Sequence, residues 1–129
     1  MTLTTEGSLQ AATTIAKTTQ TIIDKVIGCA SYDYITLFFT YVKGDETGVD
    51  IQAHFMRNAT SDAYQESSWT AAAGTKTLSQ NEYRLAASVS SYIIIDVRGI
   101  NYIKFTQGGS HNDGTPTGTL AASYSMTQS

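Results

Sequence analysis

The sequence predicts an all-β protein, a single antiparallel β-sandwich of jelly-roll type with about seven or eight strands. Three observations predict it. From Gln20 onward, apolar and polar residues alternate with a period of two in short segments, as half-buried strands require. Threonine and serine are abundant, at 20 and 13 of 129 residues, and threonine favours pleated surfaces. Because no segment shows a long amphipathic helical period, strands must pack on strands.

The length of 129 residues fits one domain with a core of its own. The first nineteen residues are polar and weakly patterned, and we interpret 1–19 as a polar N-terminal arm or a loosely held edge strand. The sandwich domain then covers 20–129. The start lacks a basic region followed by an apolar run, so we expect no secretory signal and assembly in the cytoplasm. No apolar stretch approaches 18 residues, so we expect no membrane span.

Seven segments have the strand pattern. They are 20–28, 32–43, 48–58, 82–88, 90–98, 101–107 and 118–127. The stretch 59–80 is rich in serine, alanine and threonine, and we expect a loop there, with or without a short helix. The sequence therefore places most of its strands in two groups separated by this stretch.

The segments 32–43 and 48–58 are expected to form a hairpin. Apolar residues occupy alternate positions in both, namely Ile35, Leu37, Phe39 and Tyr41, then Val49, Ile51, Ala53 and Phe55. The polar residues of the second segment, Asp50, Gln52 and His54, then face solvent. A connection with an odd number of residues brings the two apolar faces together.

The segments 90–98 and 101–107 are expected to form a second hairpin around a three-residue turn, 99–101. This register sets Val97 opposite Ile103 and Asp96 opposite Lys104, with Asn101 in the left-handed conformation. Asp96, the acid that follows three isoleucines, is then an ion-pair partner on the outer face. A two-residue turn would place apolar residues against charged ones, so the three-residue register is preferred.

The charge balance is slightly acidic, with a net charge of −3 and only 15% charged residues. Basic residues are scattered, so we expect no nucleic-acid or membrane partner. The single cysteine, Cys29, is expected to be a buried small hydrophobic residue, because no histidine lies near it in the sequence.

Candidate reactive residues are few. His54 is expected to be a solvated surface residue, and His111 lies in a polar loop with Asn112 and Asp113 that has too few carboxylates for a dedicated calcium site. Asp45, Glu46 and Asp50 are close in sequence, and paired carboxylates can hydrolyse glycosides. Neighbouring acids on a turn are normally solvated, so we expect no catalytic residue, no metal and no cofactor.

Tyr64 and Trp69 are the candidate partner-contact residues, because they lie in the polar stretch between the strand groups. Aromatic side chains there either pack over an open end of the sandwich or anchor a partner subunit or a sugar ring.

The segments 32–55, 92–109 and 118–127 resemble small β-sandwich structural proteins of tailed-bacteriophage virions, of the head-decoration or tail-associated type. The resemblance lies in strand spacing, in glycine-bounded turns and in a last strand rich in serine, threonine and alanine. It implies a non-enzymatic role in the virion, with attachment to the major capsid or tail protein. It also implies a homo-oligomer, often a trimer, and an N-terminal arm that orders on binding.

The sequence therefore favours a virion structural protein that decorates a symmetric phage particle. The alternative is a carbohydrate-binding module or adhesin domain, in which Trp69 and tyrosines stack on glycan rings. A small enzyme that uses the carboxylates at 45–50 is a third hypothesis.

Overall fold

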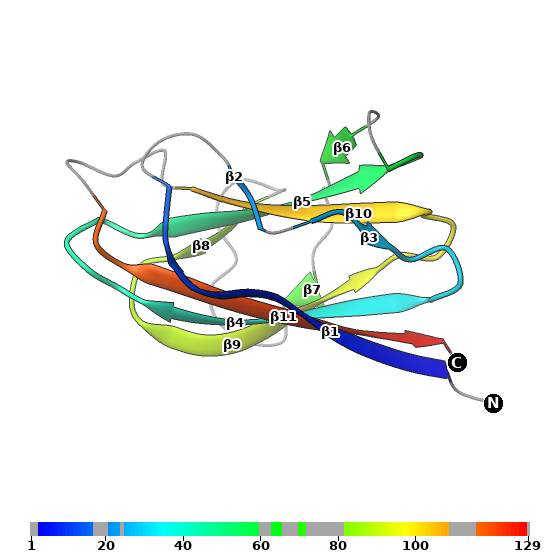
Figure 1. Ribbon diagram of the computed structural model, residues 1–129, viewed down its shortest axis with the longest axis horizontal. Helices are drawn as coiled ribbons and strands as arrows, with labels where there is room; N and C mark the ends of the chain where they lie inside the picture. The colour runs from blue at the N-terminus through cyan, green and yellow to red at the C-terminus, as the bar shows by residue number, and fades with distance from the viewer. Residues whose placement is uncertain are drawn as a thin grey trace.

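The structure is a computed structural model that describes residues 3–16, 21–23, 25–59, 63–65, 70–71, 82–108 and 116–128. Two antiparallel β-sheets pack face to face, as Figure 1 shows, with the sheet of β5 and β10 above the sheet of β4 and β11. Every regular element in these ranges is a strand. The described residues contain no helix with the length and hydrophobicity that a membrane crossing requires.

Eleven strands lie in the described residues. They are β1 (Leu3–Thr14), β2 (Thr21–Ile22), β3 (Ile27–Gly28), β4 (Tyr34–Val42), β5 (Val49–Met56), β6 (Ala63–Gln65), β7 (Thr70–Ala71), β8 (Glu82–Leu85), β9 (Val89–Asp96), β10 (Tyr102–Gly108) and β11 (Thr119–Gln128). Each of the seven predicted segments contains a strand. The first is interrupted, because β2 and β3 are separate two-residue strands.

The strand order is that of a jelly roll. Sheet A has the order β1-β11-β4-β9-β7, and sheet B has the order β2-β10-β5-β6. In sheet B, β3 also pairs with β10, and β8 also pairs with β5. Apart from the two-residue β7, each sheet thus has four strand positions, and the chain passes repeatedly from one sheet to the other. The predicted β-sandwich is confirmed.

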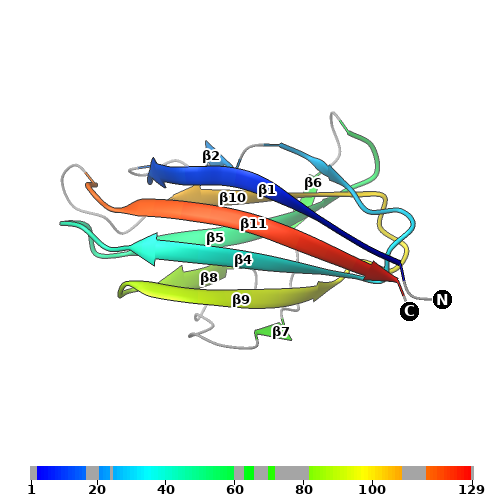
Figure 2. The ribbon, with the colours of Figure 1, turned by 60° about the horizontal axis from the view of Figure 1, so that its bottom comes forward.

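Strand β1 is the terminal strand of sheet A and pairs antiparallel with β11 (Figure 2). The pairing is regular from Leu3 to Ser8 and becomes irregular at two register shifts, between Ser8 and Gln10 and between Gln10 and Thr13. Leu9 and, just beyond the strand, Ile15 are buried in the core. The N-terminal segment therefore contributes both a sheet edge and core side chains.

One apolar layer fills the space between the sheets. From sheet A it takes the alternate residues of β4 and β9, and from sheet B those of β5 and β10. These side chains are Ile35, Leu37, Phe39, Tyr41, Ile93, Ile95, Val49, Ile51, Ala53, Ile103 and Phe105. Their burial follows the period of two that the sequence shows, because successive strand side chains point to opposite faces.

The first predicted hairpin is wrong, although its inward residues are right. Strand β4 lies in sheet A between β11 and β9, whereas β5 lies in sheet B between β10 and the pair β6 and β8. The two apolar rows therefore meet across the sandwich and not side by side. Asp50 and Gln52 are buried on the other face of β5, where solvated residues were expected, and Phe55 is half-buried.

The second predicted hairpin is also wrong. Strand β9 pairs with β4, so that Asp96 lies opposite Tyr34, and β10 pairs with β5, so that Lys104 lies opposite His54. The connection between β9 and β10 crosses from sheet A to sheet B. Gly99, with φ of 83°, takes the left-handed conformation that was assigned to Asn101. Val97 and Ile103 are both buried, as predicted.

Two adjacent phenylalanines test the assignment of faces. We expect Phe39→Ala to lower the free energy of unfolding by about 3–5 kcal/mol, because its ring lies in the core. The matched control Phe38→Ala removes a ring that is 42% exposed, and we expect a loss below about 1.5 kcal/mol. Chemical denaturation of both variants measures the difference, and equal losses would contradict the assignment.

Candidate functional site

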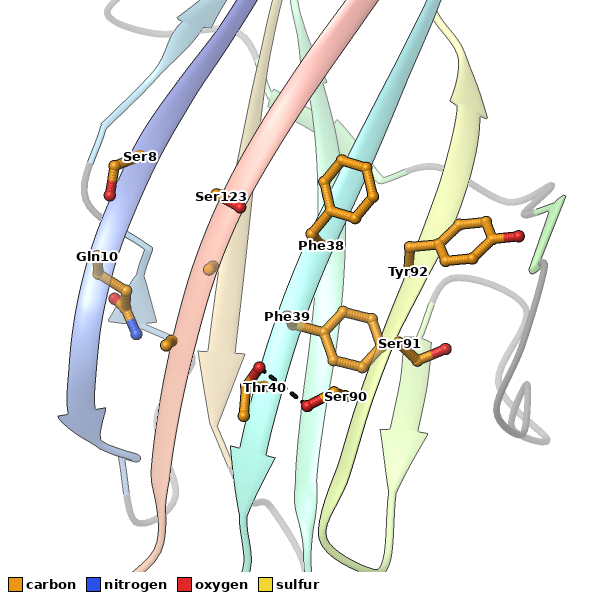
Figure 3. A pocket seen from close by; sticks show the side chains of 11 residues that line it. Ser8, Gln10, Phe38, Phe39, Thr40, Ser90, Ser91, Tyr92 and Ser123 are labelled. Atoms are coloured by element: carbon orange, nitrogen blue, oxygen red, sulfur yellow. Dashed lines mark hydrogen bonds between the residues drawn. The ribbon is translucent and has the colours of Figure 1, made fainter.

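The outer face of sheet A carries a row of side chains that crosses four strands. Ser8 of β1 pairs with Ser123 of β11, which pairs with Phe38 of β4, which in turn pairs with Tyr92 of β9. The rings of Phe38 and Tyr92 are exposed and lie 6.0 Å apart, tilted by 44°. Figure 3 shows these side chains on their four strands, with the two rings side by side.

The next row supplies further polar groups. Thr40 Oγ1 and Ser90 Oγ are hydrogen-bonded at 3.1 Å on paired positions of β4 and β9 (Figure 3). On β1, the Gln10 side chain donates from Nε2 to the Leu120 carbonyl at 2.7 Å. The side chains around the row are therefore hydroxyls, one amide and two aromatic rings.

A hollow of about 500 Å³ lies over this face, which we call the sheet A hollow. Its lining consists of Ser8, Gln10, Phe38, Phe39, Thr40, Ser90, Ser91, Tyr92, Ala121, Ala122 and Ser123. The hollow follows from residue size. The outward residues of β11 at this level, Ala121 and Ser123, are small, whereas larger side chains stand on β4, β9 and β1 on either side.

The outer face of sheet A has almost no charge. Strands β4 and β11 contain no charged residue, and β1 contains only Glu6. On β9, Asp96 lies at the end of the strand and pairs with Arg98, with 2.5 Å between Arg98 Nη2 and Asp96 Oδ2. None of the residues that line the hollow is charged.

The Asp96–Arg98 pair replaces the predicted Asp96–Lys104 pair. The carboxylate accepts hydrogen bonds from the Arg98 side chain and from the Arg98 amide at 3.0 Å. These hydrogen bonds lower the pKa of Asp96 to about 2. The Arg98 guanidinium also lies 5.6 Å from the centre of the Tyr34 ring. Asp96 is exposed and locally paired, so its role is structural.

Glu46 is an almost fully buried acid, with 1% of its surface exposed, and its carboxylate accepts four hydrogen bonds. Its Oε2 accepts hydrogen bonds from the Tyr41 hydroxyl at 2.5 Å and the Gly44 amide at 2.8 Å. Its Oε1 accepts from the amides of Thr117 at 3.1 Å and Gly118 at 2.8 Å. One carboxylate thus joins the β4–β5 connection to the segment that leads into β11.

Burial alone would raise the pKa of Glu46, but the hydrogen bonds outweigh it and hold the pKa at about 2. Burial and the neighbouring carboxylate raise the pKa of the Tyr41 hydroxyl. The pair is therefore a fixed anion and a fixed donor over the whole neutral range. The approach is close: a Cβ atom at Gly118 would overlap the Glu46 carboxylate, so glycine is required there.

The other two acids of the 45–50 group have separate roles. Asp50 is fully buried and pairs with Arg84 on the adjacent strand β8, at 2.7 Å between Arg84 Nε and Asp50 Oδ1. Asp45 is exposed, and its amide donates to Thr117 Oγ1 at 2.9 Å. Glu46 and Asp50 are thus engaged with different partners, as structural carboxylates are.

His54 is half-buried on β5, which corrects the expected solvated position. Its Nε2 lies 3.1 Å from Thr106 Oγ1, and Lys104 lies directly across from it on β10. Burial, and then the positive charge of Lys104, lower the pKa of His54. The lowered pKa favours the neutral imidazole. Within the described residues, no three histidine, cysteine, aspartate or glutamate side chains gather as a possible metal-ligand set.

Cys29 is fully buried, as predicted, and its thiol donates to the Ile100 carbonyl at 3.3 Å. Burial raises the pKa of the thiol to about 11. At neutral pH the residue is therefore a protonated core side chain.

The predicted partner-contact residues are not brought into the sheet A hollow by any described contact. Tyr64 belongs to β6 in sheet B, where its backbone pairs with that of Phe55. Trp69, His111, Asn112 and Asp113 lie outside the described residues. Their roles stay predictions.

Sequence reasoning missed Phe38 and Tyr92, the two exposed rings of the hollow. A signal was present. Phe38 interrupts the alternation, because its neighbours on the same face of the strand, Thr36 and Thr40, are polar. Tyr92 lies on the same face of its strand as Ser90 and pairs with Phe38. An aromatic residue on the polar face of a predicted strand therefore marks a candidate contact surface.

The Glu46 interaction makes stability depend on pH. Because the folded pKa lies near 2 and the ordinary value is 4.5, ionised Glu46 stabilises the fold above pH 4.5. This stabilisation, about 3 kcal/mol, is lost as the pH falls from 4.5 towards 2. We expect Tyr41→Phe to lower the free energy of unfolding at pH 7 by about 1.5–3 kcal/mol and to start acid unfolding at a higher pH.

The control for this prediction is Tyr92→Phe, which alters an exposed hydroxyl on the outer face. It should leave both the stability and the acid unfolding curve unchanged. Denaturation followed by circular dichroism at a series of pH values measures all three proteins. An acid unfolding curve for Tyr41→Phe that overlays that of the native protein would contradict the account of Glu46.

Comparison with known proteins shows similarity of fold. No protein-family model matches the chain, and no curated protein matches it by sequence. The SPBc2 prophage-derived protein YomS has a TM-score of 0.62 and 13% identity, over 99% of this chain and 96% of that chain. A chain from the structure of infectious bursal disease virus, Gx strain, has a TM-score of 0.54 and 9% identity, over 98% of this chain and 32% of that chain. The chain therefore shares its fold with a prophage-derived protein and with about one third of a viral chain.

Proposed function

We propose that this protein is a non-enzymatic structural component of a virus particle. In this role it is a decoration or accessory subunit that attaches, as a homo-oligomer, to a symmetric phage particle. The observation that carries the proposal is the edge strand β1, which can extend sheet A with a strand from a neighbouring subunit.

Strand β1 has the properties of a pairing edge. It is the last strand of sheet A, and residues 3–14 contain one charged residue, Glu6, and neither lysine, arginine nor proline. Natural edge strands that must stay unpaired are usually protected by lysine, proline or bulges. Both register shifts of β1 lie beyond Ser8, so Leu3–Ser8 is a regular stretch whose one charged side chain is Glu6. Main-chain pairing along it would give a neighbouring strand affinity and register.

The fold supports the same role. The jelly roll is a frequent architecture of virus-particle subunits, and the two fold matches come from a prophage-derived protein and a virus structure. A symmetric particle presents many equivalent sites. An oligomer that engages several of them at once attaches more firmly than one subunit could.

The test places positive charge along the proposed edge. Thr4→Lys with Glu6→Lys alters two exposed residues of β1, and we expect loss of the homo-oligomer and at least a tenfold lower occupancy on particles. The matched control, Asp45→Lys with Thr47→Lys, makes the same charge change on exposed residues of the β4–β5 connection. It should behave as the native protein does.

Light scattering after size-exclusion chromatography gives the mass in solution, and quantitative mass spectrometry of purified particles gives the copy number. Native occupancy of the β1 variant would show that the edge is not used. A native protein that is monomeric and absent from particles would overturn the proposed function itself.

A further inference from the structure

We propose that the sheet A hollow is a binding site for an uncharged carbohydrate. This inference goes beyond a role in the particle. It depends on the side chains of the hollow and not on the edge of β1, so each can fail without the other.

Two exposed aromatic rings form a platform on the outer face of sheet A. Phe38 and Tyr92 are 42% and 38% exposed and lie side by side on paired positions of β4 and β9. Two exposed rings on one rigid sheet face give an apolar surface with a fixed orientation. The C–H faces of a sugar ring pack on such a surface, while its hydroxyls point to the sides.

Hydroxyl and amide groups line the hollow around the two rings. Thr40 and Ser90 form one hydroxyl pair, and because one of them donates to the other, the acceptor keeps its own hydrogen for a ligand. Ser8 and Ser123 lie opposite each other on β1 and β11, and each adds a hydroxyl to this face. The Gln10 amide is held by its bond to the Leu120 carbonyl, which leaves Oε1 as an acceptor. Donors and acceptors thus flank the rings, as the hydroxyls of a sugar require.

The lining of the hollow is uncharged. The lining residues include no acid and no base. A sulfated, sialylated or cationic ligand would find no ionic partner among these side chains, whereas an uncharged ligand needs none. The lining therefore selects an uncharged ligand.

The hollow is wide and shallow enough for an extended ligand. The hollow has a volume of about 500 Å³ and is open along its length. The exposed side chains at its margin make it a wide hollow and not a closed cavity. An extended oligosaccharide can therefore lie along it, across β1, β11, β4 and β9 (Figure 3).

The experiment begins with the purified full chain on an array of neutral oligosaccharides of glucose, galactose, mannose and N-acetylglucosamine. Sulfated and sialylated glycans on the same array are the comparators. The strongest neutral ligand is then titrated into isotope-labelled protein and followed by nuclear magnetic resonance. We expect binding to neutral glycans, with chemical-shift changes gathered on the outward residues of β1, β11, β4 and β9.

Three variants and one control test the site. Phe38→Ala and Tyr92→Ala should each lower the affinity roughly tenfold. Ala121→Leu places a large side chain on the floor of the hollow and should abolish binding. Val42→Ala is the matched control. Val42 is an exposed residue of β4, the strand of Phe38, and it does not line the hollow. The affinity of this variant should therefore be native. Circular dichroism confirms that each variant is folded.

Three results would overturn the inference. The first is that no neutral glycan binds, or that only anionic glycans bind. The second is native affinity in both Tyr92→Ala and Ala121→Leu. The third is loss of particle attachment in Ala121→Leu, which would assign the hollow to a protein contact. Glycan binding by a protein that is absent from particles would support the inference while contradicting the proposed function.

Discussion

The rest of the structure depends on one apolar layer between the two sheets, to which every long strand contributes alternate side chains. Because Ile35, Ile51 and Ile103 are all withdrawn from water there, the polar groups of the chain must lie on the outer faces or be bonded inside. Glu46 is the exception that shows the constraint. Its buried charge is stabilised by four hydrogen-bond donors. These bonds join the β4–β5 connection, where the chain crosses from sheet A to sheet B, to the segment just before β11.

The same constraint gives the two outer faces different characters. On sheet B, the face opposite the core holds paired polar groups such as Asp50 with Arg84, and His54 next to Thr106. On sheet A, the corresponding face has hydroxyls, small residues and two exposed rings. A face with so little charge is well suited to contact with uncharged surfaces. The contacts that we propose for the edge of β1 and for the sheet A hollow are therefore of different kinds.

The alternation of residues was enough to predict the sandwich and most inward side chains, but not which strands are neighbours. The inward residues of β4 and β5 are the same whether the two strands pair in one sheet or face each other across the core. The alternation of apolar and polar residues therefore does not distinguish a hairpin from a crossing between the sheets. Asp96 was predicted to pair across strands, whereas Arg98, two residues away, is its partner. The Glu46 site joins residues 71 and 72 positions apart, a relation that no local pattern records.

We propose that sheet A is the side of the molecule that makes its contacts, with the β1 edge against a neighbouring subunit and the hollow facing outward. An electron cryo-microscopy map of the particle, at a resolution that separates strands, tests it most directly. We expect that sheet A continues across β1 into a strand of the next subunit, and that Phe38 and Tyr92 remain open to solvent. A map in which β1 has no neighbouring strand, or in which the two rings are buried against the particle, would contradict it.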